Sequence, residues 1–160
     1  MSAITIEAAQ ANLDEAQASV EKARVILEQV KALTKPTVLR LPEICVELQP
    51  GERYAGPVLD AEGKVMHHLV LMAARPGKKL SWDDAMAWAT GVGGRLPTRQ
   101  EQALLFANCK PHLDACWHWS SQEHEEDASY AWYCDFDYGS QNRDRKSYEG
   151  GAVSVRRLTA

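Results

Sequence analysis

The N-terminal segment constrains the fold most, because residues 4–35 contain neither glycine nor proline and are rich in Ala, Glu, Gln and Lys. Apolar residues recur there at alternating steps of three and four, the a/d spacing of a heptad repeat. The a positions hold Ile6, Leu13, Val20 and Leu27, and the d positions hold Ala9, Ala16, Ala23 and Val30. Pro36 cannot continue a helix. The pattern therefore predicts one long helix that ends before residue 36.

A helix of this kind needs a partner. An isolated helix of this length is marginal in water, and alanine at the d positions buries little area per turn. A parallel homo-oligomer is one arrangement; docking against the chain's own globular part or another protein is the other. The strict spacing favours the homo-oligomer, without distinguishing a dimer from a trimer. We therefore expect residues 1–36 to form an oligomerisation or docking helix.

From residue 37 onward the sequence has the pattern of a domain with strands. Short apolar stretches at 38–41 and 44–48 predict two strands. Residues 54–59 and 67–72 predict a hairpin around an Asp-Ala-Glu-Gly turn.

Two helices are predicted next. Ser81 and Thr98 occupy N-cap positions, and each is followed three residues later by a carboxylate, Asp84 or Glu101, as in a capping box. The glycine-rich residues 91–94 end the first of these helices. The order of strands, two helices and further strands predicts an α+β domain over residues 37–160.

The composition excludes several classes of protein. The 160 residues are 45% hydrophobic and carry a formal net charge of -4, so no basic field draws the chain to nucleic acid. The N-terminus lacks the pattern of a secretion signal. The longest aliphatic run, residues 69–74, is too short to span a bilayer. We expect synthesis in the cytoplasm, no nucleic-acid partner and no membrane insertion.

The four cysteines are expected to be free thiols, because the chain shows no sign of an oxidising compartment. Possible zinc ligands gather in one stretch at Cys109, His112, Cys116 and His118. Their spacing matches no familiar zinc pattern. We expect neither a metal nor a cofactor, with a zinc site at these four residues as the alternative.

A strand followed by a polar stretch is predicted near the C-terminus. From residue 130 to 138 every second residue is large or apolar, which indicates a strand with one buried face. Residues 139–146 contain no apolar side chain and are predicted to form a hydrogen-bonding turn.

Four motifs together carry a resemblance. They are GGRLPTRQE at 93–101, WHWSS at 117–121, YAWYCDF at 130–136 and VSVRRL at 153–158. The chain resembles, over residues 78–158, the C-terminal domain of the Lcl-type collagen-like adhesins, a family common in phage and bacterial surface proteins. That family is similar in fold to the formylglycine-generating enzymes and to the variable proteins of diversity-generating retroelements. The resemblance implies a C-type-lectin-like head with two helices and short twisted antiparallel strands.

The first motif also has a physical reading. Gly93 and Gly94 permit positive φ at the helix end, and Pro97 sets a rigid start for the next helix. Arg95 is expected to pair with a carboxylate. Core positions are expected for Trp117, Trp119 and Trp132, with sugar stacking by one of them as the alternative.

An enzymatic reading finds little support. The formylglycine-generating branch depends on a cysteine pair close to an R-G-G-S-W-type segment, whereas residues 149–153 read Glu-Gly-Gly-Ala-Val. No catalytic Ser/His/Asp order, Walker loop or dinucleotide fingerprint occurs. Residues 124–127, His-Glu-Glu-Asp, contain a possible carboxylate pair but no partner base is visible. We expect the protein not to be an enzyme.

Calcium-dependent sugar binding is a further alternative. The E-P-N or Q-P-D loop and the W-N-D strand of calcium-dependent lectins are absent from the sequence. Carboxylates that could hold a hard cation are Glu123, Glu125, Glu126 and Asp127.

A binding surface is the function that the resemblance implies. In the retroelement variable proteins, polar positions near the C-terminus form the ligand surface on a rigid scaffold, and such residues suit adaptable contacts. The matching residues are Tyr133, Asp135, Asp137, Tyr138, Ser140, Gln141, Asn142, Arg143, Asp144 and Tyr148. The plainer interpretation is an unremarkable hydrophilic turn.

We therefore expect a non-enzymatic binding or assembly protein, of the kind found in phage virions as a receptor-binding tail-fibre tip or a decoration protein. Its partners would be itself through the helix, and other virion proteins or a host receptor through the head. An intracellular protein-protein adaptor is the alternative.

Overall fold

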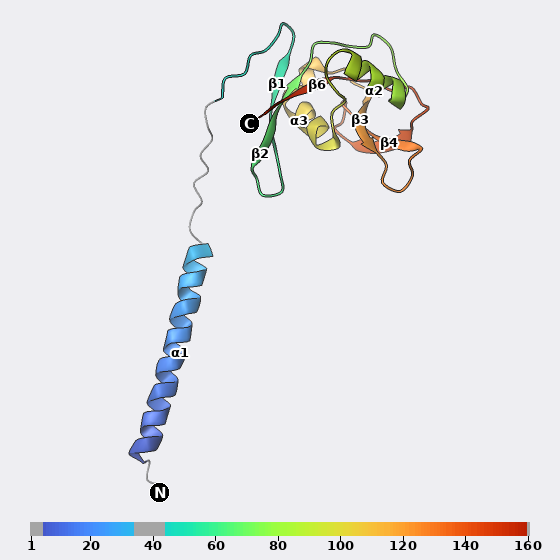
Figure 1. Cartoon of the computed structure of the whole chain (residues 1–160). Helices are drawn as coiled ribbons and strands as arrows, with labels where there is room; N and C mark the ends of the chain where they lie inside the picture. The colour runs from blue at the N-terminus through green and yellow to red at the C-terminus, as the bar shows by residue number, and fades with distance from the viewer. Residues whose placement is uncertain (1–4, 34–43, 160) are drawn as a thin grey trace. The chain divides into compact units, whose positions relative to one another are not determined.

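The computed structural model describes residues 5–33 and 44–159 (Figure 1). The chain divides into two compact units, residues 1–45 and 46–160. In the described part of the first unit the chain forms the predicted helix, α1 (Ile6–Leu33), and none of the helix residues is buried. The predicted division after Pro36 lies outside the described residues. Within the described ranges, no helix has the length and apolar character needed to cross a membrane.

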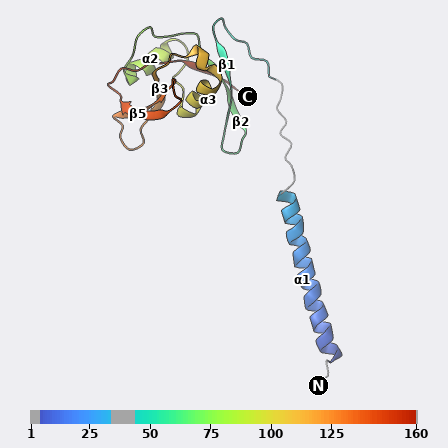
Figure 2. The same cartoon turned by 180° about the vertical axis from the view of Figure 1, so that it is seen from behind.

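The second unit, the head, is a mixed α+β domain with two small antiparallel sheets. The first sheet has the order β1-β2-β6, with β1 (Arg53–Leu59), β2 (Val65–Leu71) and β6 (Val155–Thr159). The second has the order β3-β4-β5, with β3 (Trp117–Glu123), β4 (Tyr130–Asp135) and β5 (Gln141–Arg145). The helices are α2 (Trp82–Gly91) and α3 (Arg99–Cys109), followed by the 3-10 turn η1 (Lys110–His112). Helix α3 lies between the two sheets in both views (Figures 1 and 2).

The hairpin of β1 and β2 is confirmed, but the strand predicted at 44–48 is wrong. Residues 44–49 have no regular structure, because side chains rather than a strand ladder hold this segment. Arg156 donates to the carbonyl of Glu47, and the carboxylate of Glu52 accepts from the amide of Gln49. The other predicted strand, 38–41, lies outside the described residues.

Both helix caps of the head are confirmed. The Ser81 side chain accepts from the amide of Asp84, and Thr98 forms a complete capping box with Glu101. Each cap satisfies amides that the first turn of a helix leaves without partners. The local sequence therefore sets where α2 and α3 begin.

The predicted roles of Gly94 and Arg95 need correction. Gly93 has φ +81°, as expected, but Gly94 does not adopt a positive φ. Gly94 is required by close packing, since a Cβ there would lie 2.8 Å from the carbonyl oxygen of Val155. Among the described residues Arg95 forms no ion pair; its backbone instead exchanges two hydrogen bonds with Val155. The motif thus joins the start of β6 through its backbone.

Two clusters of buried side chains fill the head. The first, between the first sheet, α3 and one face of the second sheet, consists of Ala55, Val58, Leu69, Leu71, Leu105, Cys109, Cys134, Phe136, Val153 and Val155. The second, between α2 and the opposite face of the second sheet, consists of Leu80, Trp82, Ala85, Ala89, Leu96, Trp119, Ala131 and Ala152. Of the three tryptophans predicted in the core, only Trp119 is fully buried; Trp117 and Trp132 are half-buried.

A buried carboxylate ties α3 to the first sheet. Glu101 accepts from Arg157 at 2.7 and 3.0 Å, from His67 at 2.8 Å and from the amide of Thr98 at 2.7 Å. Burial opposes ionisation, but these hydrogen bonds outweigh it, so the pKa of Glu101 lies below its ordinary value. The glutamate that caps α3 therefore also holds β2 and β6.

Candidate binding surface

Strand β4 buries side chains on both faces, not on one as predicted. Ala131 packs in the cluster beside α2, whereas Cys134 and Phe136 pack in the cluster beside α3. The reason is that the second sheet lies between the two clusters. The strand ends at Asp135, and Tyr138, predicted on the buried face, is 78% exposed in the turn that follows.

The polar stretch after β4 is a strand, so the predicted turn over residues 139–146 is wrong. Residues 141–145 form β5, which pairs antiparallel with β4 along its whole length. The turn that joins the two strands covers residues 136–140. Its Gly139 has φ +78° and lies against Phe106, where a Cβ would approach the ring to 2.6 Å. Strand β5 is polar on both sides because it is an edge strand.

The structure divides the predicted binding residues between the two faces of the sheet. The register pairs Trp132 with Arg143 and Cys134 with Gln141, so Gln141 and Arg143 share the face beside α3. The opposite face carries Tyr133, Asp135, Asn142 and Asp144. The turns at the ends of β5 carry Asp137, Tyr138, Ser140 and Tyr148, all exposed. The ten residues therefore do not form one surface.

On the face beside α3, an arginine and a tryptophan form the centre of a cluster. The Arg99 guanidinium carbon lies 3.6 Å from the centroid of the Trp132 ring, and Trp132 donates to Glu125 at 3.1 Å. Gln141 holds Arg99 in place by accepting from its Nε and donating to its carbonyl. Arg99 thus covers one face of the Trp132 ring.

The outward edge of β5 is partly closed by its own side chains. Ser140 accepts from the amide of Asp135 at one end of β4, and Lys146 donates to the carbonyl of Ser129 just before its other end. The alternate residues Arg143 and Arg145 therefore direct their amides away from the sheet. Asn142 accepts from the amide of Arg143, and Asp144 accepts from that of Arg145, both at 2.8 Å. These local bonds occupy donors that another strand would otherwise use.

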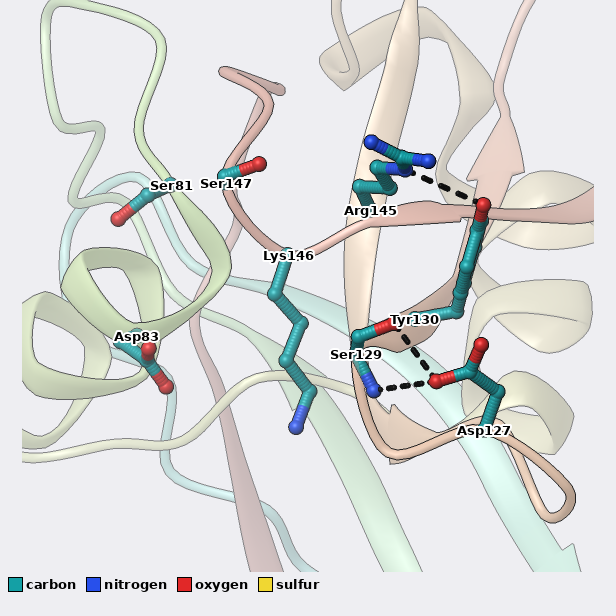
Figure 3. Close-up of a pocket in the computed structure, with 8 residues that line it drawn as sticks. All are labelled: Ser81, Asp83, Asp127, Ser129, Tyr130, Arg145, Lys146 and Ser147. Carbon is teal, nitrogen blue, oxygen red and sulfur yellow. Dashed lines mark hydrogen bonds between the residues drawn. The ribbon is translucent and has the colours of Figure 1, made fainter.

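An open pocket of about 570 Å³ lies beside the end of β5 (Figure 3). Three of its charged residues are held by internal contacts: Asp127 accepts twice from Ser129, Arg145 donates to the Tyr130 hydroxyl, and Lys146 forms an ion pair with Glu123. Lys146 also lies 4.3 Å from the ring of Trp82. The pocket walls are thus fixed by internal contacts.

The four candidate zinc ligands do not converge. Cys109 is buried at the end of α3, and the Nε2 of His112 accepts from Arg53. Only Cys116 and His118 are neighbours, with 3.8 Å between Sγ and Nδ1. Across residues 5–33 and 44–159, no three His, Cys, Asp or Glu side chains are grouped to hold a metal ion. All four cysteines are free.

The candidate calcium ligands are likewise dispersed. Glu123 is paired with Lys146, Glu125 with Trp132, and Asp127 with Ser129. These three carboxylates therefore face three different neighbours.

Sequence reasoning missed Arg99 and Glu125 as parts of the exposed surface. Arg99 was visible only as the residue after a helix cap, and its contacts with Trp132 and Gln141 join distant parts of the chain. No family model matches the chain, and comparison with curated proteins gives no match either.

Proposed function

We propose that the protein is a non-enzymatic binding and assembly protein in which α1 associates with other copies of the chain and the head presents a binding surface. One observation carries the proposal: the apolar seam of α1 is open along its length. Leu13, Val20 and Leu27 remain 51%, 52% and 53% exposed.

The energetic argument follows from the size of these side chains. Burying one Leu, Val or Ile side chain contributes about 1.5–3 kcal/mol. Four such residues occupy the a positions, so a second copy that covers them supplies the stabilisation a lone helix lacks. Small residues at d allow close approach of the helices.

The head supplies the second half of the proposal. Its core and its buried Glu101 network make a rigid scaffold, and Arg143, Tyr138 and Tyr148 are exposed at or beside the edge strand β5. Arg and Tyr are common anchors in protein interfaces. The family resemblance favours a phage virion component whose head contacts other virion proteins or a host receptor.

The test concerns the seam of α1. Leu13→Asp combined with Val20→Asp places charges where desolvation is costly, and the full-length variant should sediment as a monomer. The parent should sediment as an oligomer, and near-ultraviolet circular dichroism should show an unchanged head.

The matched control is Ala11→Asp with Ala18→Asp, which adds the same charges outside the a and d positions. This variant should keep the mass of the parent. A monomeric parent, or equal masses for the parent and the seam variant, would refute self-association through α1.

A further inference from the structure

A second pocket lies near the start of β3, away from the predicted binding residues. It has a volume of about 380 Å³ and is lined by residues 75–79 and 151–152, by Asp114 and Cys116 just before β3, and by His118 within β3. The proposed assembly function does not involve this pocket, and its Cys116 and His118 are two of the residues considered above as zinc ligands.

His118 gives the pocket a buried hydrogen-bond acceptor. The side chain is 1% exposed, and its Nδ1 lies 3.0 Å from the carbonyl oxygen of Cys116. A carbonyl only accepts, so Nδ1 carries the proton and a neutral ring has its lone pair at Nε2. Burial lowers the pKa of His118, which keeps the ring neutral near pH 7. Among the described residues, no group bonds to Nε2.

The rest of the lining is rich in donors. Lys78 and Lys79 form no ion pair within the described chain. The backbone amides of Gly77, Lys78 and Lys79 donate no hydrogen bond there either. Arg75 is fixed at the rim by donating to the carbonyls of Met72, Ala74 and His112. The pocket lining therefore holds three cationic side chains and one carboxylate, that of Asp114. The negative charge of Asp135 also interacts electrostatically with the His118 ring.

The thiol in the pocket is not set up as a nucleophile or a metal ligand. Burial, followed by the nearby Asp114, raises the pKa of Cys116, so the sulfur stays protonated and neutral. The Cys116 side chain therefore only lines the pocket.

Gly151 keeps the space beside His118 open. A Cβ at this position would lie 2.9 Å from Nε2 and 2.8 Å from Cδ2 of the ring. The absence of a side chain leaves the acceptor accessible from the pocket.

We propose that this pocket binds a small oxyanion that still carries a hydroxyl hydrogen, of which hydrogen phosphate is the simplest example. The hydroxyl donates to Nε2 of His118, and the charged oxygens accept from Lys79 and the amides of residues 77–79. Sulfate has a similar size and charge but no proton to donate near neutral pH. Its oxygen would meet the lone pair of Nε2, so the pocket discriminates between the two ions.

The experiment is a titration of the full-length chain at pH 7.5 with inorganic phosphate and, separately, with sulfate at matched ionic strength. The imidazole nitrogens of His118 are followed by NMR. Phosphate should shift the Nε2 resonance saturably. Sulfate should bind about tenfold more weakly, the factor expected for loss of one hydrogen bond to a charged partner.

Lys79→Ala should weaken phosphate binding by about fivefold or more, through loss of a charged donor. The matched control is Lys64→Ala, which removes an exposed lysine from the β1–β2 turn, outside the pocket, and should leave binding unchanged. Gly151→Ala, which fills the space at Nε2, should abolish binding. The site would be refuted by a His118 signal that does not respond to phosphate, by equal affinities for the two ions, or by parent-like binding in Lys79→Ala.

Discussion

The two longest helices of the described chain differ in which side chains they expose and which they bury. Helix α1 holds its apolar side chains in the open, with Leu13 and Val20 half exposed. Helix α3 buries a carboxylate, Glu101, and an amide, Gln102, beside Leu105. Exposing apolar side chains to water and burying polar side chains both cost free energy unless other groups compensate. In α3 the cost is offset within the head, because Arg157 and His67 pair with the carboxylate.

The head and α1 differ in where their stabilising contacts come from. The head completes its own polar and apolar contacts, so it has the features of an autonomous fold. Helix α1 leaves apolar side chains exposed, so under the proposed function its stability would come from association. The predictions below test that contrast.

The largest effect is expected from Phe136→Ala. Phe136 is buried in the cluster beside α3, and truncation leaves a cavity that should lower the free energy of unfolding of the head by about 3–5 kcal/mol. All five tryptophans lie in the head, so their fluorescence during urea denaturation reports its unfolding alone. The self-association proposed for α1 should not change.

The control for this prediction is Tyr138→Ala, which removes an exposed aromatic ring two residues away. Its cost should stay within about 0.5 kcal/mol. If Phe136→Ala unfolds the head and assembly is lost as well, the contrast would be contradicted. Association through α1 would then require a folded head.

The next effect concerns Glu101→Gln, which leaves Arg157 beside a neutral group. Breaking a buried ion pair on one side should cost about 3 kcal/mol at pH 7. The folded-state pKa of Glu101 lies below its ordinary value of 4.5, so its stabilising contribution is complete above that value. The contribution is lost as the pH falls from 4.5 through the folded-state pKa. The stability difference between parent and variant should therefore shrink between pH 5 and pH 3.

Urea denaturation at several pH values, followed by tryptophan fluorescence, measures this difference. Glu62→Gln, at an exposed position in the hairpin turn, provides the control and should show no such trend. A difference that stays constant with pH would show that the charge of Glu101 is not what stabilises the head.

Local signals in the sequence predicted a large part of the fold. The caps at Ser81 and Thr98, the β1–β2 hairpin and the long helix α1 depend on residues close together in the chain. Such features follow from short-range chemistry. The α+β class followed from their order.

Contacts between distant residues were not predictable in the same way. The sequence predicts a turn where β5 lies, because an edge strand has no apolar alternation and only its pairing with β4 defines it. Glu101 and Arg157 are 56 residues apart. Arg99 contacts Trp132 only because α3 packs on the second sheet. The residues predicted for the binding surface consequently lie on both faces of the second sheet.

The smallest effects are expected on β5, where the structure separates residues that the sequence grouped together. Gln141→Ala removes two hydrogen bonds that hold Arg99, and should cost about 1 kcal/mol, a typical net value for such bonds. Asn142→Ala combined with Arg143→Ala changes exposed side chains and should cost less than about 0.5 kcal/mol. Thermal unfolding followed by tryptophan fluorescence measures both. An equal or larger loss in the double variant would mean that Asn142 and Arg143 support the fold, and the surface available to a partner would then contract to Tyr138, Tyr148 and their turns.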